Sequence, residues 1–447
     1  MNLALALREE YLRGKYPAAR LLLPVGGILA GVTRLVAEHT APDFEIAASN
    51  LDNLSKVFPH VSMPDGRDMF NEPLGGAGAD IDPELAWLRA VMEGGERYAN
   101  MAYSQDDFVI ATAESLGDAA LDLDTLPRCS ASEYADLKCP YVPPNKSSPI
   151  RWTRGYSLTR RRECFVPSVM AHLYIKPSRD ERFWQEISTG CAAHVRLEAA
   201  LISAICEVIE RDAIAITWLA RLPLPRIQLV QPLPPVLAPN YRLLQNGLVQ
   251  QQFFDATTDV GIPTIYTVQL LDGHPSVAQY VSCATGFNAA EVCAKTIREA
   301  APARSVLAHI TDGPEEVGDF RALYDGAHHL GKPSYRQAFD FLLNTPNGRP
   351  LGDLDIEAPK DEPGQLQYLL DRLAAMGMDV AAVDLTTDEL RELGIWVVRV
   401  VIPGLMPMST VHRGRFLGHP RLYQYARDAG LGNFTEKDVN PVPQPFA

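Results

Sequence analysis

The sequence predicts an α/β (α+β) protein with one large domain, in which mixed sheets are flanked by helices and the two halves of the core are related by an internal duplication. Residues 201–218 carry apolar side chains at helical spacing over their whole length. Residues 261–272 and 279–287 look like neighbouring strands, and 394–405 is apolar almost throughout, as expected at the centre of a sheet. Helical and strand-like segments are mixed along the chain, which favours a single unit.

The composition sets limits on the class of protein. With 447 residues, 47% of them hydrophobic, the chain can bury a large core. No apolar run reaches the roughly 18 residues of a membrane helix, and the N-terminus lacks a basic segment before its short apolar run, so we expect neither a membrane span nor a signal peptide. Seven scattered cysteines favour a reducing cytoplasm. A net charge of −14 argues against a nucleic-acid partner.

The helix at residues 201–218 contains three charged residues on one face. Glu207, Glu210 and Arg211 follow one another at i, i+3 and i+4. Burying two carboxylates and one guanidinium is costly unless they find partners. Because one arginine leaves the group negative, a cation is the expected missing partner.

The same pattern occurs earlier in the chain. Residues 88–99 match 202–213 position by position, with E-x-x-E-R inside A-[VI]-x-E-x-x-E-R-x-A in both. Glu93, Glu96 and Arg97 take the places of the three charged residues described above. A single E-x-x-E-R is most simply a solvated, salt-bridged helix face. Two copies in matching apolar frames favour a functional site instead.

A third helix, predicted over residues 291–307, carries Glu299 and Arg304 in a similar apolar frame. Carboxylates from three helices could meet around Mg²⁺, which prefers oxygen ligands and usually takes phosphate oxygens with them. Arginines beside them suit those phosphates. The residues therefore predict a metal–nucleotide site in the core of the domain.

Two further segments have weaker signals. The Gly-rich stretch 71–83 could cradle phosphate through backbone N–H groups, but it lacks the lysine of a P-loop; Asp80 or Asp82, with Pro83, is a plausible helix start. The basic segment 151–164 is interpreted either as a solvated strand–turn–strand or as a groove for an acidic peptide or phosphate.

Two proline-rich segments remain. Residues 222–240 hold six prolines and are expected to form an extended connector, with an edge strand at 227–230. The chain ends in NPVPQPFA, whose alternating prolines favour polyproline II, although a frayed terminus is the simpler interpretation.

Together these residues resemble the YcaO family, and within it the azoline-forming cyclodehydratases of ribosomally made peptides. The resemblance extends from about Leu74 to Ala447 and rests on the order and spacing of its parts. The matching residues are Glu93, Glu96 and Arg97; 188–193 with Glu207, Glu210, Arg211 and Asp212; Glu299 and Arg304; 400–405 and 417–421; and the alternating Pro441, Pro443 and Pro445.

The resemblance implies a YcaO-type domain that binds ATP and Mg²⁺. In this family a Cys, Ser or Thr side chain of the substrate peptide attacks the preceding amide carbonyl. The oxyanion takes the γ-phosphoryl group of ATP, and loss of phosphate leaves a thiazoline or oxazoline. Phosphorylation is needed because the amide oxygen is otherwise a poor leaving group, and a metal and arginines can share the charge of the phosphoryl group.

The resemblance also implies roles for individual segments and residues. Residues 1–70 would be an N-terminal α/β segment packed on the core, 71–435 the catalytic core, and 436–447 a tail reaching the active site, with Pro445 and Ala447 in catalysis. The implied magnesium ligands are Glu93, Glu96, Glu207 and Glu210. The implied cofactor-binding residues are Glu93, Glu96, Arg97, Ser188, Glu198, Glu207, Glu210, Arg211, Glu299 and Arg304.

Four positions depart from the family pattern. Ala77 stands in a Gly-rich segment without the usual lysine, and Arg89 replaces a serine. Ala199 replaces a glutamate, for which Glu198 could substitute if the helix start shifts. Pro302 replaces a glutamine and is expected to end or kink the third helix. These departures motivate one alternative, a degenerate YcaO scaffold without catalysis. A second alternative is thioamide or amidine formation, against which the proline tail speaks.

The expected partners also follow from the resemblance. They are a precursor peptide, a separate leader-binding protein (E1-like or RRE-containing) and, as a further candidate, a flavin dehydrogenase. A homodimer in the cytoplasm is expected, with a role in making a bacteriocin or antibiotic of the thiazole/oxazole-modified class.

Overall fold

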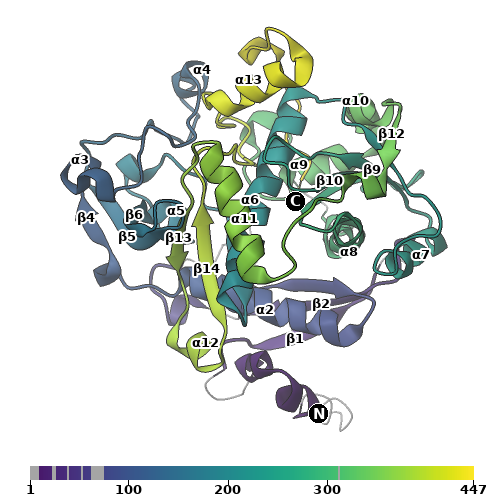
Figure 1. The fold of residues 1–447 in the computed structure, drawn as a ribbon, viewed down its shortest axis with the longest axis horizontal. Coiled ribbons are helices and arrows are strands. Elements are labelled where there is room, and N and C mark those ends of the chain that lie inside the picture. Colours follow the sequence, from purple (N-terminus) through teal and green to yellow (C-terminus); the bar gives the residue numbers. More distant parts are fainter. Residues whose placement is uncertain are drawn as a thin grey trace.

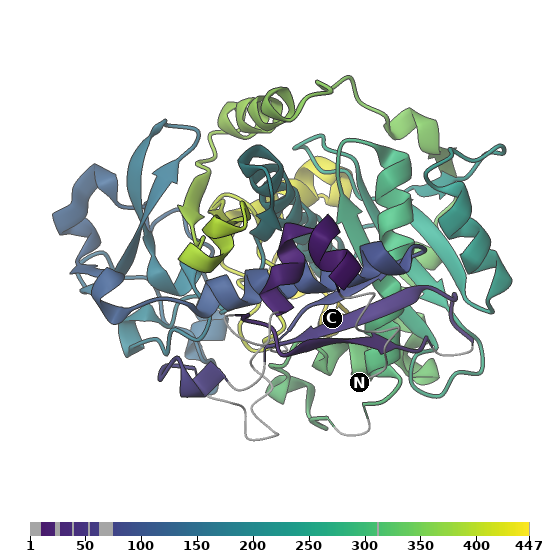
Figure 2. The same cartoon turned by 90° about the horizontal axis from the view of Figure 1, so that it is seen from below.

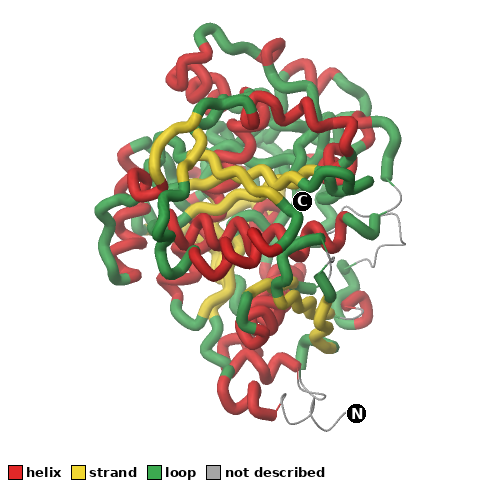
Figure 3. Tube along the Cα trace, turned by 90° about the vertical axis from the view of Figure 1, so that its right-hand side faces the viewer, coloured by secondary structure: helices red, strands yellow, loops and turns green. Residues whose placement is uncertain are grey.

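The computed structural model describes residues 10–22, 27–37, 40–51, 54–61, 75–310 and 313–446, and within them it contains three β-sheets. Helix α6 (Leu197–Ala220) stands at the centre of Figure 1, with α11 (Glu362–Ala375) alongside it and α2 (Pro83–Met101) across its lower end. In Figure 3 the strands run through the middle of the molecule with helices on both sides. The predicted fold class, mixed sheets flanked by helices, is confirmed.

A three-stranded antiparallel sheet supports the first long helix. Its order is β1 (Gly31–Leu35), β2 (Glu45–Asn50) and β3 (Ala77–Asp80). Helix α2 packs on this sheet (Figure 2). The packing requires glycine at 78, since a Cβ there would lie 2.2 Å from the carbonyl oxygen of residue 86. Asp82 caps α2 and Pro83 opens it, which confirms the predicted helix start.

The six-stranded sheet has the order β4-β5-β13-β14-β7, with β6 paired to β5. The strands are β4 (Val109–Ala111), β5 (Ile150–Ser157), β6 (Arg162–Pro167), β7 (Cys191–His194), β13 (Ala381–Asp384) and β14 (Trp396–Val401). Strand β14 lies between β13 and β7, as its continuous apolar sequence predicted, and α6 packs against it. The basic segment 151–164 forms the β5–β6 hairpin.

The five-stranded sheet has the order β11-β10-β9-β8-β12. The strands are β8 (Arg226–Gln228), β9 (Gln250–Asp255), β10 (Thr264–Leu270), β11 (Gln279–Thr285) and β12 (Asn347–Pro350). The predicted pairing of β10 with β11 is confirmed. The predicted edge strand is wrong, because β12 pairs in parallel with β8 and places it inside the sheet.

The third long helix, α8 (Ala289–Leu307), packs on β10 and β11. It continues through Pro302, so the expectation that proline would end it is wrong. Ala300, Ala301 and Leu307 are all buried around the proline. This packing offsets the roughly 3 kcal/mol that a proline costs inside a helix.

The remaining α-helices of the described residues are short. They are α3 (Ala113–Leu116), α4 (Ala131–Ala135), α5 (Ser168–Ala171), α7 (Ala238–Asn246), α9 (Asp325–Gly331), α10 (Asp340–Leu343), α12 (Asp388–Glu392) and α13 (Pro420–Ala426). Near the N-terminus, residues 10–15 are helical, and residues 1–9 lie outside the described residues. Within the described part of the chain, no helix has the length and apolar character that a membrane crossing needs.

Candidate nucleotide and metal site

The charged side chains on one face of α6 pair with one another. Glu207 accepts a hydrogen bond from the backbone N–H of Gly190 (2.9 Å, to Oε2) and one from Arg211 Nη2 (3.1 Å, to Oε1). Arg211 Nη1 donates to Glu210 Oε1 at 2.6 Å. The side chain of Glu210 is only 5% exposed, so burial has removed this carboxylate from water.

Helix α2 repeats the arrangement. Glu93 Oε2 accepts from the backbone N–H of Ala77 (2.8 Å), and Glu93 Oε1 accepts from Arg97 Nη2 (3.0 Å). In both helices, therefore, the first glutamate binds a backbone N–H at a glycine-containing segment and the arginine four residues later. The internal repeat seen in the sequence extends to the hydrogen bonds.

Both helices have residues close to Cys191. Burial raises the pKa of this thiol to about 11; Arg399 opposes the shift, while Glu96 on α2 and Glu207 on α6 add to it. The thiol donates to Asn100 Oδ1 at 2.9 Å and accepts from Arg399 Nη1 at 3.0 Å. Glutamates from α2 and α6 therefore lie within electrostatic reach of the same sulfur atom.

Helix α8 contributes a cation that the sequence reasoning missed. Lys295 Nζ lies 3.8 Å from Glu210 Oε2 and 3.6 Å from Glu299 Oε1. Burial raises the pKa of Glu210 to about 7, and Lys295 and Arg211 oppose this shift. The available signal was the position of Lys295 one helical turn before Glu299, on the same face.

Three predicted cofactor-binding residues lie further from this network. Arg304 is fully buried and donates to the carbonyl oxygen of Val277 at 2.9 Å. Ser188 is buried in the turn before β7. Glu198 lies in the first turn of α6, about 14 Å along the helix axis from Glu207. The structure therefore brings Glu207, Glu210 and Arg211 of α6 together with Lys295 and Glu299 of α8, and their roles toward a cofactor stay predictions.

The residues suit a metal only when phosphate completes its coordination. Among the described residues, no three His, Cys, Asp or Glu side chains are grouped to hold a metal ion. Mg²⁺, however, is usually bound through one or two carboxylates plus substrate phosphates. Glu210 Oε2 is buried and accepts no hydrogen bond from the described residues, and Lys295 Nζ pairs with it only at 3.8 Å, so this oxygen can still accept a closer cation. Carboxylate oxygens beside arginines thus fit Mg²⁺ with a triphosphate.

The proline-rich tail leads toward the same network. Trp218 Nε1, on α6, donates to the carbonyl oxygen of Val442 at 3.1 Å, and the Phe446 ring lies 5.3 Å from that of Tyr266. Tyr266 pairs across β10 and β11 with Cys283, whose pKa is raised by burial and by nearby Glu210. The tail is therefore packed rather than frayed. Pro445 is buried, and Ala447 lies outside the described residues.

Gly190 supports the site through its backbone. Its φ is +85°, and a Cβ there would lie 2.3 Å from the carbonyl oxygen of Val400. We expect Gly190→Ala to destabilise the protein by about 3 kcal/mol or more in urea unfolding, because strain and a backbone clash add. Gly273→Ala is the matched control, since Gly273 has a φ of +84° with nothing within 4 Å. Equal losses of stability in the two variants would contradict a contribution from the backbone clash at Gly190.

Glu186, in the loop before β7, should make stability depend on pH. Burial raises its pKa from 4.5 to about 7. The stability linked to its protonated form is complete below pH 4.5 and is lost as the pH rises through 7. Glu186→Gln should remove up to about 3 kcal/mol of this pH dependence, measured by unfolding at pH 4.5 to 8.

The control is Glu181, whose pKa shifts in the opposite direction. Burial acts to raise it, but hydrogen bonds from Arg151 and Ser178 lower it to about 2. Its contribution is present above pH 4.5 and is lost as the pH falls toward 2. Glu181→Gln should therefore keep most of the slope between pH 4.5 and 7, losing only the small part by which the Glu181 charge raises the pKa of Glu186. A flat wild-type profile in that range would contradict the assignment to Glu186.

Comparison with known protein families identifies the family of this chain. A model described as YcaO cyclodehydratase, ATP- and Mg²⁺-binding, matches residues 76–406. The chain belongs to the YcaO family. The resemblance inferred from the sequence is therefore confirmed, as are ATP and Mg²⁺ as the cofactors of this family.

Solved structures share the YcaO fold. A heterocyclase in complex with substrate and cofactor superposes with a TM-score of 0.77 at 21% identity, over 98% of this chain and 57% of the heterocyclase. The YcaO protein of Methanopyrus kandleri, bound with AMPPCP and Mg²⁺, gives 0.62 at 16% identity, over 90% and 91% of the two chains. The chain thus spans little more than half of the first protein and nearly all of the second.

A curated relative gives no activity. An uncharacterized protein from the tfuA 3′ region of Rhizobium leguminosarum bv. trifolii is 27% identical over 344 residues, which is 73% of this chain and 76% of the relative. Membership of the YcaO family and its fold are thus established, whereas the reaction and substrate require a proposal.

Proposed function

We propose that this YcaO protein is an ATP- and Mg²⁺-dependent cyclodehydratase that forms thiazoline or oxazoline rings from Cys, Ser or Thr residues of a ribosomal precursor peptide. The observation that carries the proposal is the pair of matching glutamate–arginine arrangements on α2 and α6, two helices that both approach Cys191. Asn100 of α2 accepts a hydrogen bond from the Cys191 thiol, and Glu207 of α6 accepts one from the N–H of the preceding Gly190. Such convergence is unnecessary for two solvated helix faces, but it suits a charged ligand held between the helices.

The proposed roles follow from the hydrogen bonds and burial. ATP bound with Mg²⁺ supplies the phosphoryl group that turns an amide oxygen into a leaving group. Glu207 and Glu210 would hold the metal, and Glu93 and Glu96 would complete the acidic lining from α2. Arg211, which now binds both glutamates, would contact phosphate oxygens.

The remaining cofactor-binding assignments belong to the same proposal. Arg97 would act from α2 as Arg211 does from α6. Ser188 and Glu198 would contribute near the start of α6. Glu299 and Arg304 would contribute from α8, where Lys295 already bridges Glu210 and Glu299.

The tail is proposed to order the site or to carry a proton. Phe446 is 4% exposed and packs on Tyr266, and Pro445 before it is buried as well. Deleting residues 446–447 should lower ring formation at least a hundredfold while ATP binding is kept, because the helix residues that would bind ATP remain. Normal turnover by the shortened chain would remove the tail from the mechanism.

The direct test is ATP-dependent loss of 18 Da per ring from a precursor peptide, with phosphate release. The assay should include a separate leader-binding partner, since this proposal expects one, together with a homodimeric enzyme and a product of the bacteriocin or antibiotic class. A gain in mass from exchange of oxygen for sulfur would indicate thioamide formation instead. No mass change and no phosphate release would contradict the proposal.

One observation favours a second candidate, a non-catalytic YcaO scaffold. The atypical Arg89 forms an ion pair with Asp80 (3.0 Å), and Lys295 bridges Glu210 and Glu299. Several acidic groups are thus already paired within the chain. Calorimetry separates the two candidates: a scaffold should bind no ATP–Mg²⁺, even with the partner present.

A further inference from the structure

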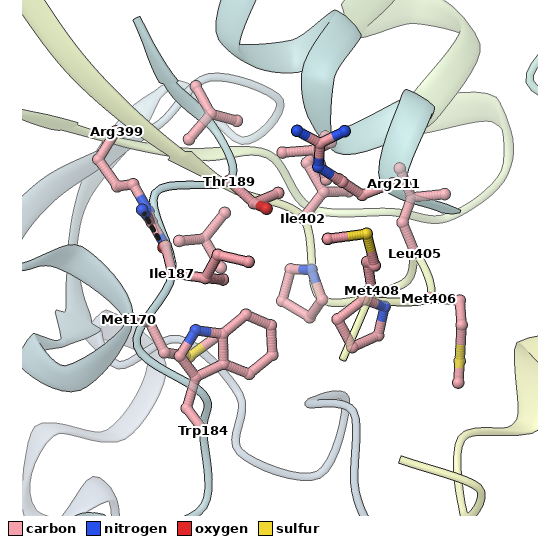
Figure 4. Close-up of a pocket in the computed structure, with 15 residues that line it drawn as sticks. Met170, Trp184, Ile187, Thr189, Arg211, Arg399, Ile402, Leu405, Met406 and Met408 are labelled. Carbon is pink, nitrogen blue, oxygen red and sulfur yellow. Dashed lines mark hydrogen bonds between the residues drawn. The ribbon is translucent and has the colours of Figure 1, made fainter. Parts of the chain in front are cut away.

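A pocket lies between α6, the end of β14 and the loop that precedes β7. It has a volume of about 30 Å³. Figure 4 shows Arg399 and Arg211 along its upper side and Trp184 below them. The lining is otherwise mostly apolar: Met170, Ile187, Thr189, Val208, 400–403, Leu405, Met406, Pro407 and Met408.

The pocket adjoins the proposed nucleotide site. Arg211 belongs to both, since its two terminal nitrogens bind Glu207 and Glu210 while its side chain lines the pocket. Thr189 precedes Gly190, whose N–H binds Glu207. A group in this pocket would therefore lie beside the atoms that the proposed function assigns to phosphoryl transfer.

The lining offers hydrogen-bond donors without acceptors. Within the described part of the chain, Trp184 Nε1, Arg211 Nε and Arg399 Nε are buried and donate no hydrogen bond. Arg399 is 2% exposed, and its Nη1 donates only to the carbonyl oxygen of Ile187 (2.8 Å) and to Cys191 Sγ. Buried donors of this kind are costly unless a ligand or water supplies acceptors.

The side chains that line the pocket limit the kind of substrate side chain that it can bind. The lining holds two guanidinium groups and no carboxylate, so a cationic side chain would be repelled and would lose its hydration. A carboxylate would have to be buried against methionine and aliphatic walls, beside an Arg211 that already holds two glutamates. An uncharged apolar side chain avoids both costs. The flexible methionines can repack to admit one larger than the present cavity.

We infer that this pocket binds the residue of the substrate peptide that immediately precedes the ring-forming Cys, Ser or Thr, and that it selects an uncharged apolar side chain there. The backbone carbonyl of that residue is the one attacked during cyclisation, and it supplies the acceptor that Arg211 Nε and Trp184 Nε1 lack. This inference rests on the proposed function and adds to it the specificity of the peptide site.

The test uses blocked dipeptides and the indole N–H of Trp184. The full chain, labelled with ¹⁵N and loaded with AMPPCP–Mg²⁺, is titrated with N-acetyl-Leu-Cys-amide, N-acetyl-Lys-Cys-amide and N-acetyl-Glu-Cys-amide. The Trp184 signal is assigned from a Trp184→Phe variant. We expect the leucyl peptide to move this signal downfield as a hydrogen bond forms, and the lysyl and glutamyl peptides to bind at least roughly tenfold more weakly.

Two methionine variants test whether the lining of the pocket determines which peptide it prefers. Met408→Ala enlarges the pocket and should raise the affinity for N-acetyl-Trp-Cys-amide relative to the leucyl peptide. Met101→Ala is the matched control, because Met101 is equally buried (1% exposed, against 3% for Met408) in a different core cluster. Met101→Ala should leave the ratio of the affinities for the tryptophyl and leucyl peptides unchanged.

The outcomes separate this inference from the proposed function. A Trp184 signal that stays in place with the leucyl peptide at millimolar concentration, or moves equally with the lysyl or glutamyl peptide, overturns the pocket assignment if AMPPCP–Mg²⁺ binding is intact. Loss of nucleotide binding itself would instead contradict the proposed function. An unchanged peptide ratio in Met408→Ala also overturns the assignment.

Discussion

Glu207→Gln and Glu210→Gln, singly and together, are expected to weaken ATP–Mg²⁺ binding by roughly thirtyfold or more, because each removes a charged acceptor from a buried ionic network. The fold should persist, since glutamine keeps the size of the side chain and can still accept a hydrogen bond from Arg211 or Gly190. Isothermal titration calorimetry measures the affinity, and circular dichroism verifies the fold.

The control for these variants is an exposed glutamate on a different element. Glu392→Gln, on α12, changes the net charge equally but lies at the surface, so it should leave the affinity unchanged. An affinity that falls equally in Glu392→Gln would indicate a general charge effect. Unchanged affinity in the double variant would remove α6 from the nucleotide site.

Asp212→Ala is expected to destabilise the protein by about 3–5 kcal/mol, because it breaks a buried ion pair and leaves its partners unsatisfied. Asp212 is fully buried and accepts from Arg421 Nε (2.7 Å) and Nη2 (2.6 Å), and from the backbone N–H of Met406 (2.7 Å). This residue therefore ties α6 to α13 and to the loop after β14. Urea unfolding measures the loss.

Asp259→Ala is the control for this prediction. Asp259 binds the same guanidinium, with Arg421 Nη2 2.8 Å from its Oδ1, but its side chain is 48% exposed. Exposed pairs contribute about 0–1 kcal/mol, so this loss should be small. Losses of similar size in the two variants would contradict the view that burial makes the Asp212 pair decisive.

The sequence carried most of the information on the three long helices. Each shows apolar periodicity over more than three turns, and Asp82 with Pro83 marks the start of α2 in the sequence itself. Neighbouring strands β10 and β11 and the interior position of β14 were also predictable from their apolar runs. The interior position of β8 in the five-stranded sheet was not predictable, because β8 gains its second neighbour from β12, more than a hundred residues later.

The site was predictable in its acidic residues and less so in its details. The repeated E-x-x-E-R identified Glu93 and Glu207, and the structure shows that they bind equivalent backbone N–H groups. Lys295 was missed because its position one turn before Glu299 does not show that Glu210, on another helix, lies near it. The three hydrogen bonds that Asp212 accepts from Arg421 and Met406 likewise join segments about 200 residues apart, which spacing along the chain does not reveal.

The most direct measurement is a crystal structure of the protein with AMPPCP and Mn²⁺, in which the anomalous signal of the metal gives its position. We predict a peak within coordination distance of the Glu207 and Glu210 carboxylates, facing Glu93 and Glu96, with Arg211 on a phosphate oxygen. A nucleotide bound elsewhere, or a metal peak away from these carboxylates, would contradict the account.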